Sequence, residues 1–178
     1  MNYTRLYIPN SIVFITVVTS KRREILIDNI ELLKHSIANA HKFYEFSILA
    51  ICVLKDHFHL LIKTKNIKDY SKIITLIKRT FSQNIDINKI KDYQLSQSNI
   101  KRKECDIWQR RFWEHTIINE YDLFKHIDYI HYNPTKHYNI PPKDWKYSTF
   151  KKYVKNGYYE IDWFNIGNKY DILKLDFE

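Results

Sequence analysis

The segment Asp-His-Phe-His-Leu-Leu-Ile at residues 56–62 decides the fold that we predict for this chain. In an extended strand, successive side chains point to opposite faces of the sheet. The apolar residues that alternate from Phe58 to Ile62 therefore share one face, and His57 and His59 lie together on the other. The pattern predicts a strand with one core face and, on its other face, two neighbouring imidazoles.

The two histidines are close enough in such a strand to bind one divalent cation. Neutral imidazole is a common metal ligand, and two protein ligands leave positions for water or a substrate oxygen, as catalytic sites do. The alternative is that His57 and His59 are polar residues on a solvated strand face, where such a pair arises by chance. The metal interpretation therefore needs a partner elsewhere in the chain.

The composition indicates a single domain inside the cell. The chain has 178 residues, of which 44% are apolar, and no apolar run approaches the roughly 18 residues of a membrane span. It has only two cysteines, Cys52 and Cys105, and its first residues lack the apolar core of a signal peptide. We therefore expect one cytoplasmic domain over residues 1–178, with no membrane partner.

The charge of the chain favours a polyanionic partner. The formal net charge is +9 and the sequence pI is about 9.4, and nucleic acid is the commonest polyanion in a cell. Aromatic residues make up 16% of the chain and offer flat surfaces on which unpaired bases could stack. The alternative is that the aromatic residues are mostly core and the lysines only keep the protein in solution.

Two further apolar stretches accompany the first strand. Residues 12–19 are β-branched and apolar and predict a buried strand, which leads into a basic cluster at residues 21–23. Residues 46–54 are almost wholly apolar, so we expect them to form a central strand of the sheet. The short link at residues 55–56 indicates a tight antiparallel hairpin between this strand and the histidine strand.

Helical spacing of apolar residues marks two segments, at residues 28–41 and 69–81. Residues 86–106 form a long basic stretch without apolar period, which predicts a loop, and residues 108–118 regain extended aromatic character. The order is strand, helix, hairpin, helix, strand and a last helix. It predicts an α+β fold with an antiparallel sheet and packed helices, closest to the split β-α-β-β-α-β arrangement.

The last helix supplies a partner for the histidines. Asn119 is typical of an N-cap, and Pro134 disfavours helical geometry at the residue before it, so the helix is predicted to end near Asn133. At about 100° per residue, His126, Tyr129 and Asn133 share one face at the edge of the apolar stripe. A phenol, an imidazole and an amide therefore face the same way.

This combination favours phosphoryl chemistry. A tyrosine phenol can attack phosphorus and form a covalent phosphotyrosine, and a divalent cation assists by polarising the phosphoryl oxygens. The carbonyl oxygen of Asn133, one helical turn beyond Tyr129, could complete a ligand set with His57 and His59. Two alternatives stand beside this interpretation. The first is that Tyr129 is an arbitrary choice, because the chain has 14 tyrosines. The second is that Asn133 is only the amide that often ends a helix before proline.

Several motifs together resemble one family of DNA-processing enzymes. They are Asp56-His57-Phe58-His59, Gln109-Arg110-Arg111-Phe112-Trp113-Glu114-His115, Asp128-Tyr129-Ile130-His131-Tyr132-Asn133-Pro134-Thr135-Lys136-His137 and Trp145-Lys146-Tyr147-Ser148-Thr149-Phe150, with the N-terminal strand that ends at Lys21-Arg22-Arg23. This set is similar to the REP-associated tyrosine transposases, which belong to the IS200-like group of single-tyrosine HUH nucleases. The likeness extends over most of the chain.

The resemblance implies a ferredoxin-like or RRM-like sheet that carries the histidine pair, with the nucleophile on a neighbouring helix. It implies cleavage of single-stranded DNA with Mg²⁺ or Mn²⁺, which leaves a 5′-phosphotyrosine and a free 3′-OH, and rejoining to another 3′-OH. By this resemblance Tyr129 is the nucleophile, and His57, His59 and Asn133 hold the cation. The partner would be single-stranded or hairpin DNA, such as REP-like palindromes, and the protein a monomer or a homodimer.

Six basic residues are expected to contact DNA phosphates, namely Lys21, Arg22, Arg23, Arg110, Arg111 and Lys136. The loop at about 86–106 and a C-terminal extension from about residue 138 would complete the transposase domain. Two other functions stay open. One is a non-catalytic protein that binds single-stranded nucleic acid on an RRM-like sheet, a domesticated transposase. The other is a metal-dependent phosphodiesterase that uses activated water, in which Tyr129 is only structural.

Overall fold

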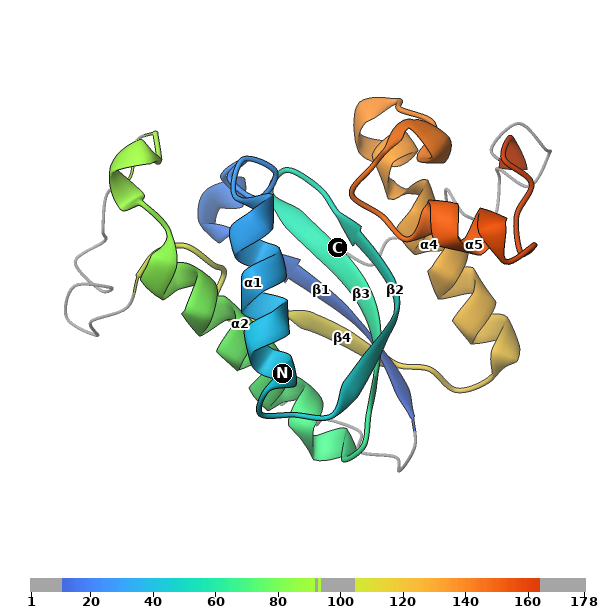
Figure 1. Cartoon of the computed structure of the whole chain (residues 1–178), viewed down its shortest axis with the longest axis horizontal. Helices are drawn as coiled ribbons and strands as arrows, with labels where there is room; N and C mark the ends of the chain where they lie inside the picture. Colours follow the sequence, from blue (N-terminus) through green and yellow to red (C-terminus); the bar gives the residue numbers. More distant parts are fainter. Residues whose placement is uncertain (1–10, 92, 94–104, 164–178) are drawn as a thin grey trace.

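The computed structural model describes residues 11–91, 93 and 105–163, and the fold is given for these residues (Figure 1). The strands are β1 (Ile12–Val18), β2 (Phe46–Val53), β3 (His57–Thr64) and β4 (Trp113–Thr116). The helices are α1 (Ile30–His41), α2 (Tyr70–Asn84), α4 (Glu120–Tyr138) and α5 (Phe150–Lys155). Short 3-10 turns lie at Ser20–Arg22, Ile67–Asp69, Ile87–Lys89 and Pro142–Asp144.

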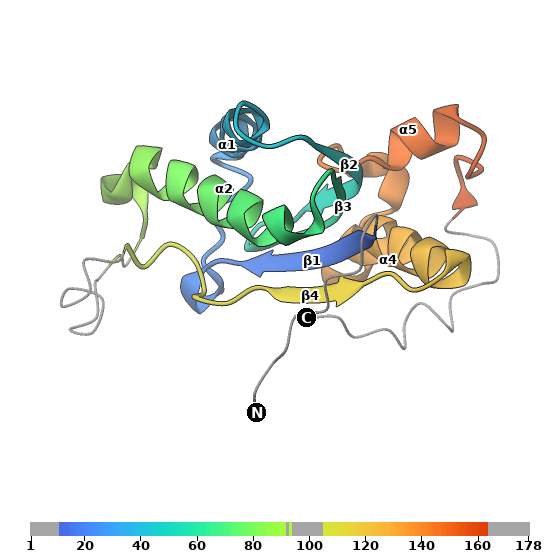
Figure 2. The ribbon, with the colours of Figure 1, turned by 90° about the horizontal axis from the view of Figure 1, so that it is seen from below.

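The four strands form one antiparallel sheet in the order β2-β3-β1-β4. With α1 between β1 and β2, and α2 between β3 and β4, this is the split β-α-β-β-α-β topology, so the predicted α+β fold is confirmed. Helices α1 and α2 lie on one side of the sheet, as Figure 2 shows, and α4 packs against the other side. The histidine strand β3 is therefore internal, between β2 and β1.

The face toward α1 and α2 is an apolar core. The alternate β3 residues Phe58, Leu60 and Ile62 are each at most 1% exposed and pack with Val13 and Ile15 of β1. Apolar side chains of α1 and α2 cover them from above. The period-two pattern thus places this face of β3 in the core, as predicted.

The opposite face is buried as well, under α4. Phe14 and Leu61 of the sheet pack with Ile127 and Ile130 of the helix. This face is mixed, because buried polar side chains from β3 and α4 lie among the apolar ones. The histidine face is therefore an interior surface and not a solvated one.

The prediction that residues 46–54 form a central strand is wrong, because β2 ends the sheet. Its outer edge is covered by a later segment of the chain. The Val53 amide donates to the Tyr147 carbonyl at 2.8 Å, and the Thr149 amide donates to the Ile51 carbonyl at 3.0 Å. An edge strand that is covered in this way is shielded from water, so it can be as apolar as a central strand.

The prediction that the last helix ends near Asn133 is also wrong. Helix α4 continues through Pro134 to Tyr138 and is capped by Asn139, which has a φ of 55° and donates its amide to the Thr135 carbonyl at 3.0 Å. Tertiary contacts hold the added turn, since the Tyr138 hydroxyl accepts the Lys55 amide at 3.0 Å. These contacts outweigh the local preference of the residue before proline.

Other predicted features are placed as follows. Helix α1 begins after Asn29 rather than Asp28, and the Asn119 side chain caps α4 by accepting the Asp122 amide at 2.8 Å. Of the predicted loop at 86–106, residues 92 and 94–104 lie outside the described residues. Within the part that is described, no helix is long and apolar enough to cross a membrane.

Candidate active site

His57 and His59 project from β3 toward α4 and are completely buried. Their ring centroids are 4.9 Å apart, with the ring planes at 84° to each other. The alternation of β3 places both on one face, and β1 and β4 continue that face with Phe14, Thr16 and Trp113. The strand therefore presents two imidazoles side by side in the interior.

The Nδ1 atom of each imidazole is already engaged by a neighbouring oxygen. Nδ1 of His57 donates to Asp56 Oδ1 at 2.6 Å, and Nδ1 of His59 lies 2.8 Å from Thr16 Oγ1. A metal-binding histidine usually hydrogen-bonds through its second ring nitrogen, which fixes the ring and its tautomer. This arrangement makes Nε2 the atom of each ring that would serve as a ligand.

Asp56 is itself held by Arg22, whose Nη1 donates to Asp56 Oδ2 at 3.1 Å. Burial raises the pKa of the Asp56 carboxyl, but the hydrogen bonds and charges of His57 and Arg22 outweigh it, so its pKa lies below the usual range. Asp56 is thus an anion that orients His57.

The turn that delivers Arg22 is strained. Lys21 and Arg22 have φ values of 56° and 50°, in the left-handed region that side chains other than glycine rarely adopt. Two such residues in succession persist only where the surroundings hold them. Here the Ser20 amide donates to the Ile107 carbonyl at 2.9 Å, and the Thr19 hydroxyl donates to the Arg23 carbonyl at 2.9 Å.

Helix α4 places Tyr129 over the histidines. The Tyr129 side chain is 1% exposed, and its ring centroid lies 5.3 Å from that of His59 in an edge-to-face arrangement. Lys136, two turns further along α4, donates from Nζ to the Tyr129 hydroxyl at 3.4 Å. The ring of His137 lies 5.0 Å from that of His57. The extra turn of α4 therefore brings two more basic side chains to the site.

Asn133 carries a side-chain oxygen that could serve as a third ligand. Its Nδ2 donates to the Tyr129 carbonyl at 2.8 Å, which turns Oδ1 the other way. That oxygen is buried and has no hydrogen-bond partner among the described residues. A buried acceptor without a partner is rare and costly in proteins. An amide oxygen and two imidazole nitrogens are donor types that suit a divalent cation.

The six residues predicted to contact phosphates differ in exposure and in distance from the histidine site. Arg23 pairs with Asp106 at 3.0 Å and its side chain is only 10% exposed, whereas Lys21 is 63% exposed and lies 3.9 Å from the same carboxylate. Arg110 and Arg111 are exposed on the segment before β4. Arg22 is half exposed and Lys136 lies at the phenol, so both are close to the histidine site.

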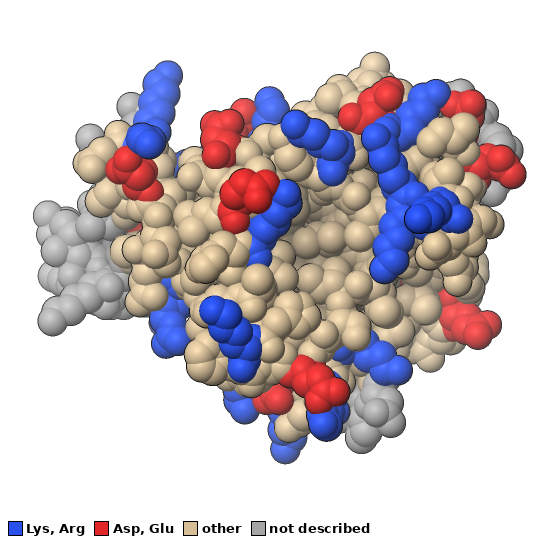
Figure 3. All heavy atoms as spheres, viewed as in Figure 1, with Lys and Arg blue, Asp and Glu red and all other residues tan. Residues whose placement is uncertain are grey.

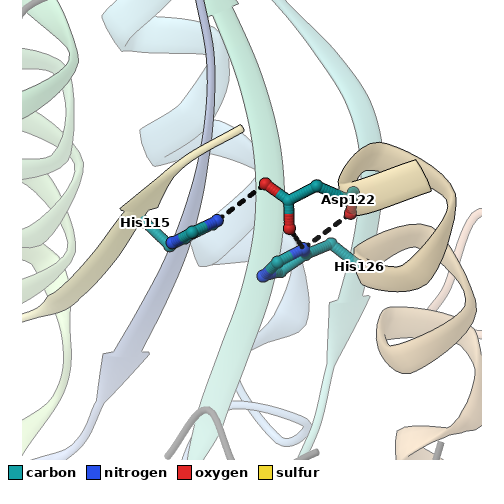
Figure 4. Close-up of side chains that lie close together, drawn as sticks. All are labelled: His115, Asp122 and His126. Atoms are coloured by element: carbon teal, nitrogen blue, oxygen red, sulfur yellow. Dashed lines mark hydrogen bonds and ion pairs between the residues drawn. The ribbon is translucent and has the colours of Figure 1, made fainter. Parts of the chain in front are cut away.

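A second cluster, His115, Asp122 and His126, joins β4 to α4 (Figure 4). One potential ligand atom from each residue lies within 4.8 Å of the others. His115 Nε2 contacts Asp122 Oδ2 at 2.8 Å, and His126 Nδ1 contacts Asp122 Oδ1 at 3.1 Å and the Asp122 carbonyl at 2.8 Å. The two imidazoles are stacked, with centroids 4.8 Å apart and planes at 10°.

This cluster is better described as a hydrogen-bonded link between β4 and α4 than as a metal site. The Asp122 carboxylate also accepts the Ile118 amide at 3.0 Å, so three donors already occupy it. Burial raises the pKa of Asp122, but the His115 and Ile118 hydrogen bonds outweigh it and keep the pKa below the usual range. Burial lowers the pKa of His126. His126 therefore shares a helix face with Tyr129 and Asn133, as predicted, but its side chain bonds to Asp122 and stacks on His115.

Sequence reasoning missed Asp56 and Thr16 as supports for the histidines. An acidic residue directly before a metal-binding histidine is a signal that could have identified Asp56. Thr16 carries no such signal, because only the register of β1 against β3, which pairs Thr16 with His59, brings the two together.

A separate groove lies between α1 and the segment at residues 146–149, on the α1 side of the sheet. Figure 3 shows this face hollowed near its centre, with Lys and Arg side chains on both sides. Its lining includes Ile48 and Val53 of β2, which belong to the core on the α1 and α2 side. The sheet therefore separates this groove from Tyr129.

Comparison with known proteins gives a consistent result. Residues 8–133 match the family described as IS200-like transposases. A REP-associated tyrosine transposase of Escherichia coli is 33% identical, with 90% of this chain and 89% of the relative covered. A Haemophilus influenzae relative of the same group is 38% identical, with 91% and 92% covered.

A solved structure extends the likeness to three dimensions. It is a REP-associated tyrosine transposase bound to a REP hairpin, with a TM-score of 0.75 and 32% identity, and the match covers 94% of this chain and 92% of that one. The fold, the family match and the relatives agree. The chain therefore belongs to the IS200-like transposase family, in the group of REP-associated tyrosine transposases.

Proposed function

We propose that this protein cleaves and rejoins single-stranded DNA through a covalent phosphotyrosine at Tyr129, with Mg²⁺ or Mn²⁺ held by His57, His59 and Asn133. The observation that carries the proposal is the meeting of α4 and β3. The Tyr129 ring contacts His59, and the buried Asn133 oxygen in the next helical turn has no hydrogen-bond partner among the described residues. The proposed nucleophile and the proposed third ligand are thus carried on adjacent turns of the helix that packs against the histidine pair.

The chain prepares its ligands in advance. Asp56 and Thr16 engage Nδ1 of the two histidines, and the Asn133 amide group is oriented by its bond to the Tyr129 carbonyl. Transposases of this family generally use a divalent metal. When bound, such a cation polarises the phosphoryl oxygens and stabilises the charge that develops on them.

The reaction is an in-line exchange of oxygen atoms on phosphorus. The Tyr129 oxygen forms a bond to phosphorus, the bond from phosphorus to the 3′ oxygen breaks, and the proton released by the phenol is balanced by the one that the 3′-OH gains. A free 3′-OH attacks the phosphotyrosine in the reverse step and restores the phenol. The Lys136 ammonium, 3.4 Å from the phenol oxygen, is placed to contact the phosphate in both steps.

The structure of the relative bound to a REP hairpin supports hairpin DNA as the partner. Lys21, Arg22, Arg110 and Arg111 are available to contact backbone phosphates beyond the site, because all four side chains are exposed. We assign Arg23 mainly to holding Asp106, since its side chain is only 10% exposed. DNA affinity should fall steeply with salt in proportion to these contacts.

The contacts within the chain favour a site assembled in one subunit. Tyr129 meets His59 of the same chain, so a monomer has a complete set of the proposed residues. The segment after α4 also covers the edge of β2, which supports residues 1–178 acting as one domain. The two cysteines, buried Cys52 and exposed Cys105, are free thiols, which suits the reducing cytoplasm.

The decisive experiment is a search for the covalent intermediate. Labelled hairpin DNA with a single-stranded flank is incubated with the protein and Mn²⁺, and an adduct that survives denaturing electrophoresis is measured. We expect an adduct with the wild type, none with Tyr129→Phe and none with His59→Ala. Tyr121→Phe, a change at an exposed tyrosine on the same helix, is the matched control and should leave the adduct unchanged.

The other outcomes identify the other functions. Cleavage that persists in Tyr129→Phe without an adduct would show a phosphodiesterase that uses water. Binding without any cleavage by the wild type would show a non-catalytic protein that binds single-stranded DNA. Either result would overturn the proposal.

A further inference from the structure

We infer that Trp113, stacked on His115 at the edge of the sheet, is the platform for an unpaired base next to the phosphate that Tyr129 attacks. The inference rests on the proposed function, because it assumes single-stranded DNA at that site. Trp113 would contact a base, whereas the basic residues described above would contact the charged backbone.

Trp113 is the most exposed member of a series of nearly parallel rings. Trp113 stacks on His115 with centroids 6.1 Å apart and planes at 15°, and His115 stacks on the buried His126 with planes at 10°. Trp113 is 39% exposed, so one part of its indole is covered by the protein and another meets solvent. The solvent-exposed part of the indole offers a flat surface to a base, and stacking on aromatic side chains is how proteins hold single-stranded bases.

The platform lies beside the active site. Trp113 and His59 are both register partners of Thr16, so the three residues form one row across β4, β1 and β3. Neighbouring strands are about 4.8 Å apart, which places the Trp113 backbone about 10 Å from that of His59. The Phe14 ring also contacts the rings of Trp113 and Tyr129, with centroid distances of 5.6 Å and 6.0 Å. A base stacked there belongs to a nucleotide close to the attacked phosphate.

The surroundings hold the platform in place before DNA binds. Asp122 fixes the His115 ring through the 2.8 Å hydrogen bond to Nε2. Lys78 of α2 donates to the Gln109 and Arg110 carbonyls at 2.8 and 3.3 Å, which anchors the segment that enters β4. On the opposite face of β4, Glu114 accepts the Tyr70 hydroxyl at 2.7 Å. A rigid platform loses little conformational entropy when a base binds.

The charge around the platform favours a nucleic acid over a second copy of this chain. Arg110 and Arg111 are exposed two or three residues before Trp113, and Lys125 lies on the adjoining helix, directly before His126. The whole chain carries a net charge of +9, so two copies that met through this basic edge would repel each other. Aromatic faces beside guanidinium groups match the alternating bases and phosphates of a single strand.

The test measures binding in the Tyr129→Phe background, so it does not depend on covalent chemistry. The probe is hairpin DNA whose single-stranded flank carries one abasic site, moved along the flank from one oligonucleotide to the next. We expect Trp113→Ala to weaken binding of the intact probe about tenfold, and one abasic position to do the same with Trp113 present. In Trp113→Ala, that position should have no further effect, while Trp113→Phe should keep most of the affinity.

Phe43→Ala is the matched control, because Phe43 is an exposed aromatic residue beyond α1, at 68% exposure, on the far side of the sheet. It should leave binding and the abasic scan unchanged. Circular dichroism and the melting temperature establish that each variant is folded, and Trp113→Phe serves as the readout if the alanine variant does not fold.

Three results would overturn the inference. The first is unchanged affinity in both Trp113 variants. The second is an abasic scan whose effects add to that of Trp113→Ala at every position. The third is a Trp113-dependent change in oligomeric state by light scattering, with DNA affinity unaffected. Absence of the covalent adduct in the wild type would instead count against the proposed function and would leave this binding result interpretable.

Discussion

The two faces of the sheet use the same strands for opposite purposes. Toward α1 and α2, the alternate residues of β3 are Phe58, Leu60 and Ile62, and they belong to the apolar core. Toward α4, the residues between them include His57 and His59, which are equally buried. Burying a polar group is unfavourable unless it is hydrogen-bonded, so the second face costs stability that the first does not. This contrast is expected if the α4 face carries the proposed chemistry.

The polar groups of the α4 face are supported individually. Asp56 and Thr16 bind the two β3 histidines, and Asp122 binds His115 and His126. The apolar β3 residues on the α1 and α2 face need no such partners, because dispersion and the hydrophobic effect act without direction. The first face should therefore tolerate substitutions that preserve volume, and the second only those that preserve hydrogen bonding.

The largest effects are expected from substituting one buried residue on each face of β3. Phe58→Ala removes a completely buried ring from the apolar face and should lower the free energy of unfolding by about 3–5 kcal/mol. His57→Ala, next to it on the other face, should abolish detectable Mn²⁺ binding with a smaller loss of stability. Urea denaturation and calorimetric titration measure the two quantities. If His57→Ala destabilised the protein as much as Phe58→Ala without changing Mn²⁺ binding, the α4 face would be a second structural core.

A smaller effect should come from acid. Burial lowers the pKa of His131 on α4 to about 3, from its ordinary value of 6.5. The unfolded chain takes up this proton below pH 6.5 and the folded chain does not. Stability is therefore complete above pH 6.5 and declines as the pH falls toward about 3, by about 2 kcal/mol at pH 5.

His131→Gln should remove most of this pH dependence, because glutamine does not titrate. Its side chain can still bond the Thr149 hydroxyl, which lies 2.9 Å from His131 Nε2. The measurement is the urea midpoint at pH 7 and pH 5 for both proteins. Equal acid sensitivity in both would place the titrating group elsewhere on the α4 side, with His126, whose pKa burial also lowers, as the first residue to examine.

The smallest of these effects should come from the support of one ligand. Asp56→Asn removes the charge that orients His57 and should weaken Mn²⁺ binding about tenfold, with little change in stability. Asp69→Asn is the matched control, because Asp69 pairs with Lys72 at the surface. An Asp56→Asn variant with wild-type Mn²⁺ affinity would show that the buried position of His57 is sufficient to orient it.

The sequence predicted the α+β topology and the location of β3, because period-two and helical patterns are local properties. It also placed Tyr129 and Asn133 on one helix face. The edge position of β2 was not predictable in the same way, since its apolar run reflects a cover supplied by residues almost 100 positions later. The same reason explains why Thr16 and the His115–Asp122 contact were missed, because both depend on how separate elements pack together.

The continuation of α4 through Pro134 has a consequence for how the site is assembled. Tyr129, Asn133 and Lys136 are all carried by one rigid rod, whereas the histidines belong to the sheet. The proposed active centre is therefore assembled from two elements, β3 and α4, that meet at one interface. A small shift or rotation of α4 would move the proposed nucleophile, the proposed amide ligand and the Lys136 ammonium together. Substitutions far from the chemistry that reseat α4 on the sheet could therefore tune the whole centre at once.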